Sequence, residues 1–392
     1  MLRTLLLLVV LCASFGNAHA LSGNYLVNPL DDDGRVVPGF YPNIELDAGY
    51  DDNVRRTERN TDSSTFGKVK PELQWVGSVG KHLVRFGYQG DYAKFFDASS
   101  EDYDDHFVGG DLTLDLTPKF KVHGGVAYRQ GHEDRSTQSG GKWRDPNTWD
   151  QWSAKVEALY GRRIATMQIG GSYAHHDRDY TNNNQSFRDN TADILTLIAY
   201  YNIGPKTRLL IEPSVTDYDY PNSDTDNTYR KLLAGVTWDA TAKTTGEVKV
   251  GYYNKDFDNS GFEDADGLAI DAILRWRPKS YSEWELRVSQ GAYDSEIIGS
   301  PSASYESTLV AIDWEHDLTS LTQLQAGASY EVEDFDTGRE DDYTNAYLGL
   351  SYALTRTLTV GARYEYNQRD SSAPFNDYDA NVFTLGVKTT FD

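Results

Sequence analysis

Cysteine, positive charge and long apolar runs are all scarce in this 392-residue chain. The single cysteine, Cys12, lies within the first 20 residues, so the rest of the chain can form neither a disulfide nor a thiolate metal site. Lys and Arg number 37 against 60 Asp and Glu, and this acidic balance argues against a nucleic-acid partner. The mean hydropathy of −0.60, without any later run of about 18 apolar residues, excludes membrane-spanning helices.

The first 20 residues have the pattern of a secretory signal peptide. Arg3 supplies an early positive charge, an apolar core runs from Leu5 to Leu11, and Ala18-His19-Ala20 forms a small-x-small cleavage site. Cleavage there leaves a mature chain with 36 Lys and Arg against 60 Asp and Glu, a net charge of −24. Residues 21–38 carry Gly, Pro and three consecutive Asp without alternation, so we expect a periplasmic or lumenal N-terminal segment.

Residues 39–391 repeat one unit about nine times. Each unit has a strand of alternating apolar and polar residues, a short turn such as TPK or TAK, a second strand of the same kind, and an acidic loop rich in Tyr, Asp and Asn. A period of roughly 39 residues built from antiparallel hairpins, with no helical stretch between them, indicates a sheet that closes on itself. The sequence therefore predicts an all-β fold, a transmembrane antiparallel up-and-down β-barrel of about 18 strands.

Alternation is cleanest near the end of the chain. Leu348 and Leu350 share one face of the segment 342–354, while Tyr347 and Gly349 take the other. A one-residue slip in the next segment would place Arg363 in lipid, so the register is strongly specified. Segments 188–202 and 207–220 show the pattern least clearly, because the first is apolar on both faces and Pro213 interrupts the second.

Short connections alternate with longer polar ones, which matches the periplasmic turns and outer loops of an outer-membrane barrel. The longest loops are expected at 53–64 and 131–148. Aromatic residues at strand ends are expected to form girdles at the lipid–water boundary; they are Tyr92, Phe95, Phe96, Tyr218, Tyr220, Trp276 and Trp284. A soluble β-propeller has a similar period, but its strands are about six residues long and these run about 12 to 15.

The polar face of the strands carries both signs of charge. The residues expected to line the lumen are Lys68, Lys70, Glu72, Arg85, Asp91, Asp111, Lys121, Arg129, Lys249, Asp271, Arg275, Arg287, Glu331, Tyr347, Arg363, Glu365 and Lys388. Water or tight pairing must satisfy such a face, because an unpaired buried ion costs several kcal/mol. It is then either a self-paired wall without ligand preference or a hydrophilic path for a sugar polymer, with Tyr41 and Tyr347 placed to stack on sugar rings.

Neither catalysis nor a cofactor is predicted. The one notable histidine cluster, His175-His176-Asp177, has no serine motif beside it, and adjacent residues of a strand point to opposite faces. The acidic loop DFDNSGFED at 256–264 lacks the spacing of a calcium-binding loop. The acidic residues of this loop are better explained as solvated side chains, among the divalent cations near lipopolysaccharide, than as a dedicated metal site.

Three stretches resemble the family of putative β-barrel porins often encoded in exopolysaccharide or capsule loci: GYDDNV (Gly49 to Val54), RDNTADILTL (Arg188 to Leu197) and YRKLLAGVTWDATAKTTGEVKVGY (Tyr229 to Tyr252). The resemblance implies a barrel of about eighteen strands in the outer membrane, among its lipid and lipopolysaccharide. It implies export of polysaccharide together with a periplasmic polysaccharide-export protein, and it gives no site residues. Two alternatives stay open: a general or solute-specific diffusion porin for small hydrophilic solutes, and a closed structural or adhesive barrel.

Overall fold

The computed structural model describes residues 36–137, 143–241, 243–295 and 303–391. The predicted signal peptide and nearly all of the segment 21–38 lie outside these ranges. Within them, no helix is long and apolar enough to cross a membrane. The described residues form eighteen strands: β1 (Gly39–Asp51), β2 (Ser64–Val79), β3 (His82–Phe95), β4 (Tyr103–Thr117), β5 (Phe120–His132), β6 (Thr148–Tyr160), β7 (Met167–Tyr180), β8 (Asn190–Gly204), β9 (Thr207–Asp219), β10 (Asn227–Thr241), β11 (Thr244–Phe257), β12 (Ala265–Lys279), β13 (Ser282–Asp294), β14 (Ser304–Asp317), β15 (Thr322–Phe335), β16 (Glu340–Ala353), β17 (Leu358–Ser371) and β18 (Tyr378–Thr390).

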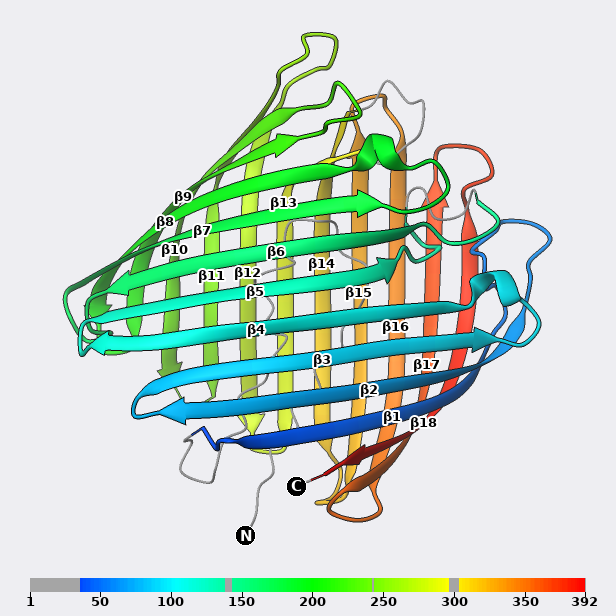
Figure 1. Ribbon diagram of the computed structural model, residues 1–392, viewed down its shortest axis with the longest axis horizontal. Coiled ribbons are helices and arrows are strands. Elements are labelled where there is room, and N and C mark those ends of the chain that lie inside the picture. Colours follow the sequence, from blue (N-terminus) through cyan, green and yellow to red (C-terminus); the bar gives the residue numbers. More distant parts are fainter. Residues whose placement is uncertain (1–35, 138–142, 242, 296–302, 392) are drawn as a thin grey trace.

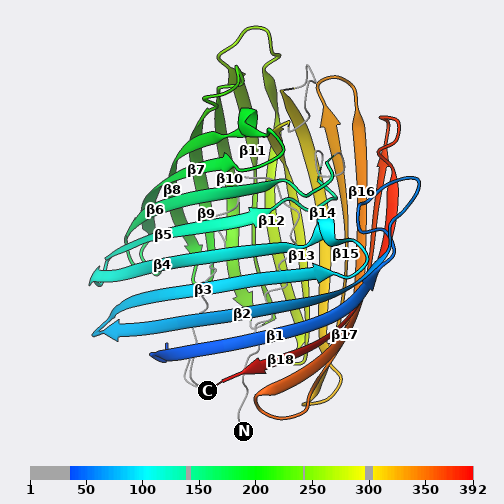
Figure 2. The ribbon, with the colours of Figure 1, turned by 45° about the vertical axis from the view of Figure 1, so that its right-hand side comes forward.

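The strands form one closed antiparallel barrel, as the repeat predicts. Each strand pairs with its neighbours in the sequence, and β1 pairs with β18 over Asn43–Asp51 to close the wall. Figures 1 and 2 show this continuous wall from two directions. Closure removes the two sheet edges whose unpaired backbone groups could not be left in lipid.

The two rims of the barrel differ in the length of their connections. We call the rim with the eight short connections the turn rim; these are residues 80–81, 118–119, 161–166, 205–206, 242–243, 280–281, 318–321 and 354–357. The opposite loop rim carries nine connections that are longer on average, including 52–63 and 133–147, although 336–339 is as short as some turns. It also holds two short 3₁₀ helices, η1 (Ser99–Glu101) and η3 (Ser186–Arg188). β1 begins and β18 ends at the turn rim, so both ends of the barrel chain lie on the side predicted to be periplasmic (Figure 1).

The outer wall is apolar because one residue in two along each strand points away from the lumen. On β16 and β18, Leu348, Leu350 and Leu385 are 53%, 47% and 67% exposed, whereas an ordinary protein would bury them. Comparable leucine, valine and aromatic side chains are exposed around the whole barrel. Such a continuous apolar surface needs acyl chains rather than water as its solvent.

The ladder is irregular at several places, and two of them bear on the sequence predictions and on the shape of the wall. Next to Pro213, β8 and β9 lose regular pairing between the Thr196–Ser214 and Ala199–Ile211 partners, at the strand pair predicted to be weakest. The ladder between β12 and β13 runs only from Ile270 and Gln290 to the turn rim, although both strands continue toward the loop rim. No pattern in the sequence predicts this second break.

Candidate functional site

The inner face of the barrel collects the polar residues of every strand. The ladder partners Asp47–Lys68 and Glu45–Lys70 of β1 and β2 define this face. Followed from strand to strand, the register places all seventeen predicted lumen-lining residues on it. Whether this face borders a conducting path stays a prediction.

Most of the charges on the inner face are compensated by neighbours on the same or an adjacent strand. Lys249 is the most heavily paired, with carboxylate oxygens of Asp271, Glu212 and Glu247 at 2.9, 3.2 and 3.4 Å. Five other cations of the predicted set have close partners: Lys70–Asp47 (2.7 Å), Arg85–Asp111 (2.8 Å), Arg275–Glu285 (2.6 Å), Arg287–Asp313 (2.7 Å) and Arg363–Glu365 (2.8 Å). The wall therefore combines high polarity with extensive pairing among its own charges.

Tyr41 and Tyr347, the two candidates for stacking on sugar rings, differ in their position along the barrel and in the side chains around them. The Tyr347 hydroxyl donates to Asp313 at 2.7 Å, and the Arg363 guanidinium covers one face of the Tyr347 ring at 3.8 Å from its centroid. Its hydroxyl and one face of its ring are therefore occupied by neighbouring side chains. Tyr41 lies near the turn rim, where its hydroxyl donates to the carbonyl of Val37 at 2.8 Å.

In the connection between β5 and β6 the structure describes residues 133–137 and 143–147, and we call these two limbs the mouth loop. Arg369 of β17 lies 3.5 Å from the carbonyl of Thr137 in this loop. In the closed wall five strands lie between β5 and β17, so the loop must reach across the lumen to make this contact. It narrows the barrel at this end.

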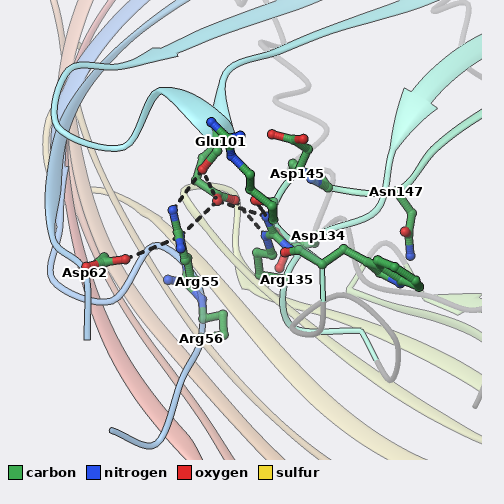
Figure 3. A network of polar contacts seen from close by, with 12 residues as sticks. Arg55, Arg56, Asp62, Glu101, Asp134, Arg135, Asp145 and Asn147 are labelled. Atoms are coloured by element: carbon green, nitrogen blue, oxygen red, sulfur yellow. Dashed lines mark hydrogen bonds and ion pairs between the residues drawn. The ribbon is translucent and has the colours of Figure 1, made fainter. Parts of the chain in front are cut away.

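A buried ion pair between Arg135 and Glu101 holds the mouth loop to η1 (Figure 3). The guanidinium donates Nε to Glu101 Oε2 at 2.7 Å and Nη2 to Oε1 at 2.9 Å. Its other donors reach the carbonyls of Trp143 and Arg144, at 2.7 and 2.8 Å, and so tie together the two limbs of the loop. Both side chains are buried, which makes this bidentate pair a strong and specific contact.

A second buried cluster anchors the start of the mouth loop to η3. Glu133 accepts hydrogen bonds from Arg188, from the Tyr180 hydroxyl at 2.8 Å and from the Asn147 amide at 2.8 Å. Burial alone would raise the pKa of Glu133, but Arg188 and these hydrogen bonds outweigh it and the pKa is lowered. In the same way Arg56 and the hydrogen bonds from Ser136 overcome burial and lower the pKa of Asp134.

Acid is therefore expected to loosen the mouth loop. Carboxylates with lowered pKa values stabilise the folded state fully above their ordinary pKa, here 4.5 for Glu133 and 3.8 for Asp134. That stabilisation is lost as the pH falls through the lowered values. Limited proteolysis of the reconstituted barrel between pH 7 and pH 3 should show cleavage within 133–147 only at the acid end. Cleavage that is equal at all pH values would contradict this.

At the loop rim the end of β13 turns inward from the wall. Ala292 of β13 packs with Leu233, Tyr253 and Ala269, which belong to the inner face of β10, β11 and β12. Asp294 receives the buried Lys255 ammonium at 2.7 Å and the Asn227 amide at 2.9 Å. The break in the β12–β13 ladder thus lets this end of β13 narrow the lumen further.

The structure corrects two of the predicted girdle residues. Phe95 packs against the buried Phe66 on the inner face, with ring centroids 5.6 Å apart. Tyr218 also points inward, beneath the Lys255 ammonium at 5.0 Å. Phe95 and Phe96 are consecutive and so face opposite sides, and only one of them can meet lipid. Tyr218 lies an even number of residues from the inward Glu212 on β9 and therefore shares its face. Tyr92, Phe96 and Trp276 are exposed as predicted.

The two adjacent histidines also face opposite sides. His175 contacts Asp193 on the outer wall at 2.8 Å, while His176 contacts Ser153 on the inner wall at 3.0 Å. Within the described ranges, no three His, Cys, Asp or Glu side chains converge as metal ligands.

The closed antiparallel wall, apolar outside and charged inside, defines an outer-membrane porin-like β-barrel. The family model described as "Putative beta-barrel porin 2" matches residues 34–391, and the chain belongs to this family. Porins are channels without enzymatic activity.

Two solved structures are similar to the chain at low sequence identity. Pseudomonas aeruginosa OccK2 (OpdF) matches with a TM-score of 0.50 and 11% identity, over 90% of this chain and 98% of that chain. Acinetobacter baumannii OccAB3 matches with a TM-score of 0.48 and 13% identity, over 90% and 99%. The chain has no significant match among curated proteins.

Proposed function

We propose that the barrel is a conduit that exports exopolysaccharide together with a periplasmic polysaccharide-export protein. The observation that carries this proposal is the inner face, which is polar along its length and largely self-paired. A polymer of sugar units can exchange hydrogen bonds with such a wall at each step. Because most inward charges are already compensated, the wall offers few unpaired ions that would hold a charged or neutral polymer in place.

The turn rim is the side from which a periplasmic polymer would enter. Tyr41 lies close to this opening and Tyr347 lies further along the inner face, each with ring surface suited to the apolar face of a sugar. The mouth loop then forms the exit on the other side, and it must move for a polymer to pass. In this proposal the loop is the gate, and Arg135, Glu101, Glu133 and Arg188 hold it closed.

A second candidate, a diffusion porin for small hydrophilic solutes, is favoured by the same mouth loop. A loop that crosses the lumen restricts its width, as a selective solute channel requires. Such a channel would pass solutes without the loop being displaced.

Deletion and complementation of the gene in its own host separate the two candidates. Export predicts that secreted polysaccharide falls sharply on deletion, that polymer accumulates in the periplasm, and that the full chain restores secretion. A matched complementation with a barrel whose mouth loop is cross-linked shut, through cysteines at positions 137 and 369, should fail to restore secretion until reductant is added. Normal secretion with reduced uptake of small sugars would overturn the export proposal and support the diffusion porin.

A further inference from the structure

The turn rim has a charge opposite to that of the chain as a whole. The eight turns contain seven basic residues and no Asp or Glu; the basic residues are Lys81, Lys119, Arg162, Arg163, Lys206, Lys243 and Arg356. The chain overall has 60 acidic against 37 basic residues, so its average composition does not account for this. All seven side chains are exposed.

Of the acidic residues at the strand ends beside the turns, Glu283 pairs with Arg277 of β12, Asp317 accepts a hydrogen bond from Gln323, and Asp239 meets a cation of the ring. Asp239, close to the end of β10, lies 3.7 Å from Arg163, and both side chains are more than half exposed. An ion pair of that length and exposure contributes little. The carboxylates of the connecting segments lie at the other rim, as in Asp224, Asp226 and Asp258. The barrel therefore has a basic turn rim and an acidic loop rim.

Exposed apolar and aromatic side chains lie among these cations. Ile164 is 85% exposed and directly follows Arg162 and Arg163, and Leu354 is exposed two residues before Arg356. On the outer wall beside the turns, Tyr160, Tyr201, Trp276, Tyr281 and Tyr352 are also exposed. Aromatic rings of this kind mark the level of the lipid headgroups. The turns consequently lie at the membrane interface rather than far out in the aqueous phase.

We propose that the turn rim docks on anionic phospholipid headgroups of the leaflet that surrounds it. Turns that carry cations but no acidic residue of their own, with exposed apolar side chains among them at headgroup level, suit a surface of phosphodiester groups above acyl chains. A soluble acidic protein would explain the cations but not the exposed Ile164 and Leu354 beside them. The proposal does not depend on what passes through the lumen.

The test measures lipid selectivity of the full-length barrel with three turn cations removed. Arg162→Gln, Arg163→Gln and Lys206→Gln form the test variant. Arg59→Gln, Lys94→Gln and Arg230→Gln remove three exposed cations at the loop rim and form the matched control. Each barrel is placed in mixed micelles, and retained phosphatidylglycerol and phosphatidylcholine are counted by native mass spectrometry. Far-UV circular dichroism and heat-modifiable migration on gels verify that each variant is folded.

We expect the unsubstituted protein and the loop-rim control to retain phosphatidylglycerol preferentially. Each basic residue at an anionic membrane surface strengthens binding by about fivefold, so the turn-rim variant should lose more than about tenfold of this preference. High salt should abolish the preference. Equal selectivity in the two triple variants would overturn the proposal. So would full displacement of lipid by inorganic phosphate at constant ionic strength, or tighter binding to polyglutamate than to phosphatidylglycerol vesicles.

Discussion

Arg135→Gln is expected to open the loop-rim end of the barrel and raise its single-channel conductance several-fold in planar bilayers. The substitution removes the bidentate partner of Glu101 and two of the bonds to the loop's own carbonyls. Removing one partner of a buried ion pair typically costs about 3–5 kcal/mol, and Arg55, 3.3 Å from Glu101, offsets only part of the charge left behind. The cluster around Glu133 still anchors the ends of the mouth loop, but the two limbs that Arg135 ties together lose their attachment to η1 and should move out of the lumen.

Two controls make this prediction specific. Arg230→Gln removes the same charge from an exposed pair with Asp256 on the outer wall, and it should leave conductance unchanged. The double variant Glu101→Leu with Arg135→Met replaces both charges by apolar side chains and should recover much of the closure. Unchanged conductance and unchanged proteolysis of residues 133–147 in Arg135→Gln would show that this pair does not hold the loop.

An arginine placed on the outer wall should destabilise the barrel far more than one placed on the inner wall of the same strand. Leu348 and Asn345 lie near the middle of β16, three residues apart and on opposite faces. Leu348→Arg places a guanidinium in lipid near the bilayer centre, at an expected cost of about 2–4 kcal/mol. Asn345→Arg places it among the polar side chains of Ser329 and Asn367, where we expect little change.

The measurement is the free energy of unfolding in phosphatidylcholine vesicles, from denaturant titration followed by tryptophan fluorescence. The two variants have the same new side chain, so their difference reports the surroundings of each face. Equal losses of stability would mean that Leu348 does not face lipid. A larger loss for Asn345→Arg would reverse the assignment of the two faces.

The sequence predicted the barrel because its signal is periodic and local. Alternation fixes which face each residue takes, and the spacing of turns fixes strand number, so even Arg363 and Lys388 could be assigned to one face. Pro213 made the pair β8–β9 hard to predict, yet the two strands pair regularly on both sides of the irregularity beside it.

The closing of the loop rim could not be predicted in the same way. Arg135 and Glu101 are 34 positions apart and lie in connections that have no periodicity. Arg369 meets the mouth loop across 232 positions. The inward turn of β13 likewise depends on packing between Ala292 and residues of three other strands. Such contacts follow from the closed fold, and alternation along one strand carries no information about them.

Labelling of single cysteines along β17 tests the central claim most directly, namely that one face of each strand meets lipid and the other an aqueous lumen. The only native cysteine, Cys12, is easily replaced. Cysteines at positions 360, 362 and 364 should resist a charged maleimide and be quenched by brominated lipid once labelled with a small fluorophore. Cysteines at positions 361, 363 and 365 should react with the charged maleimide and escape quenching. Reactivity and quenching that do not alternate along β17 would contradict the claim.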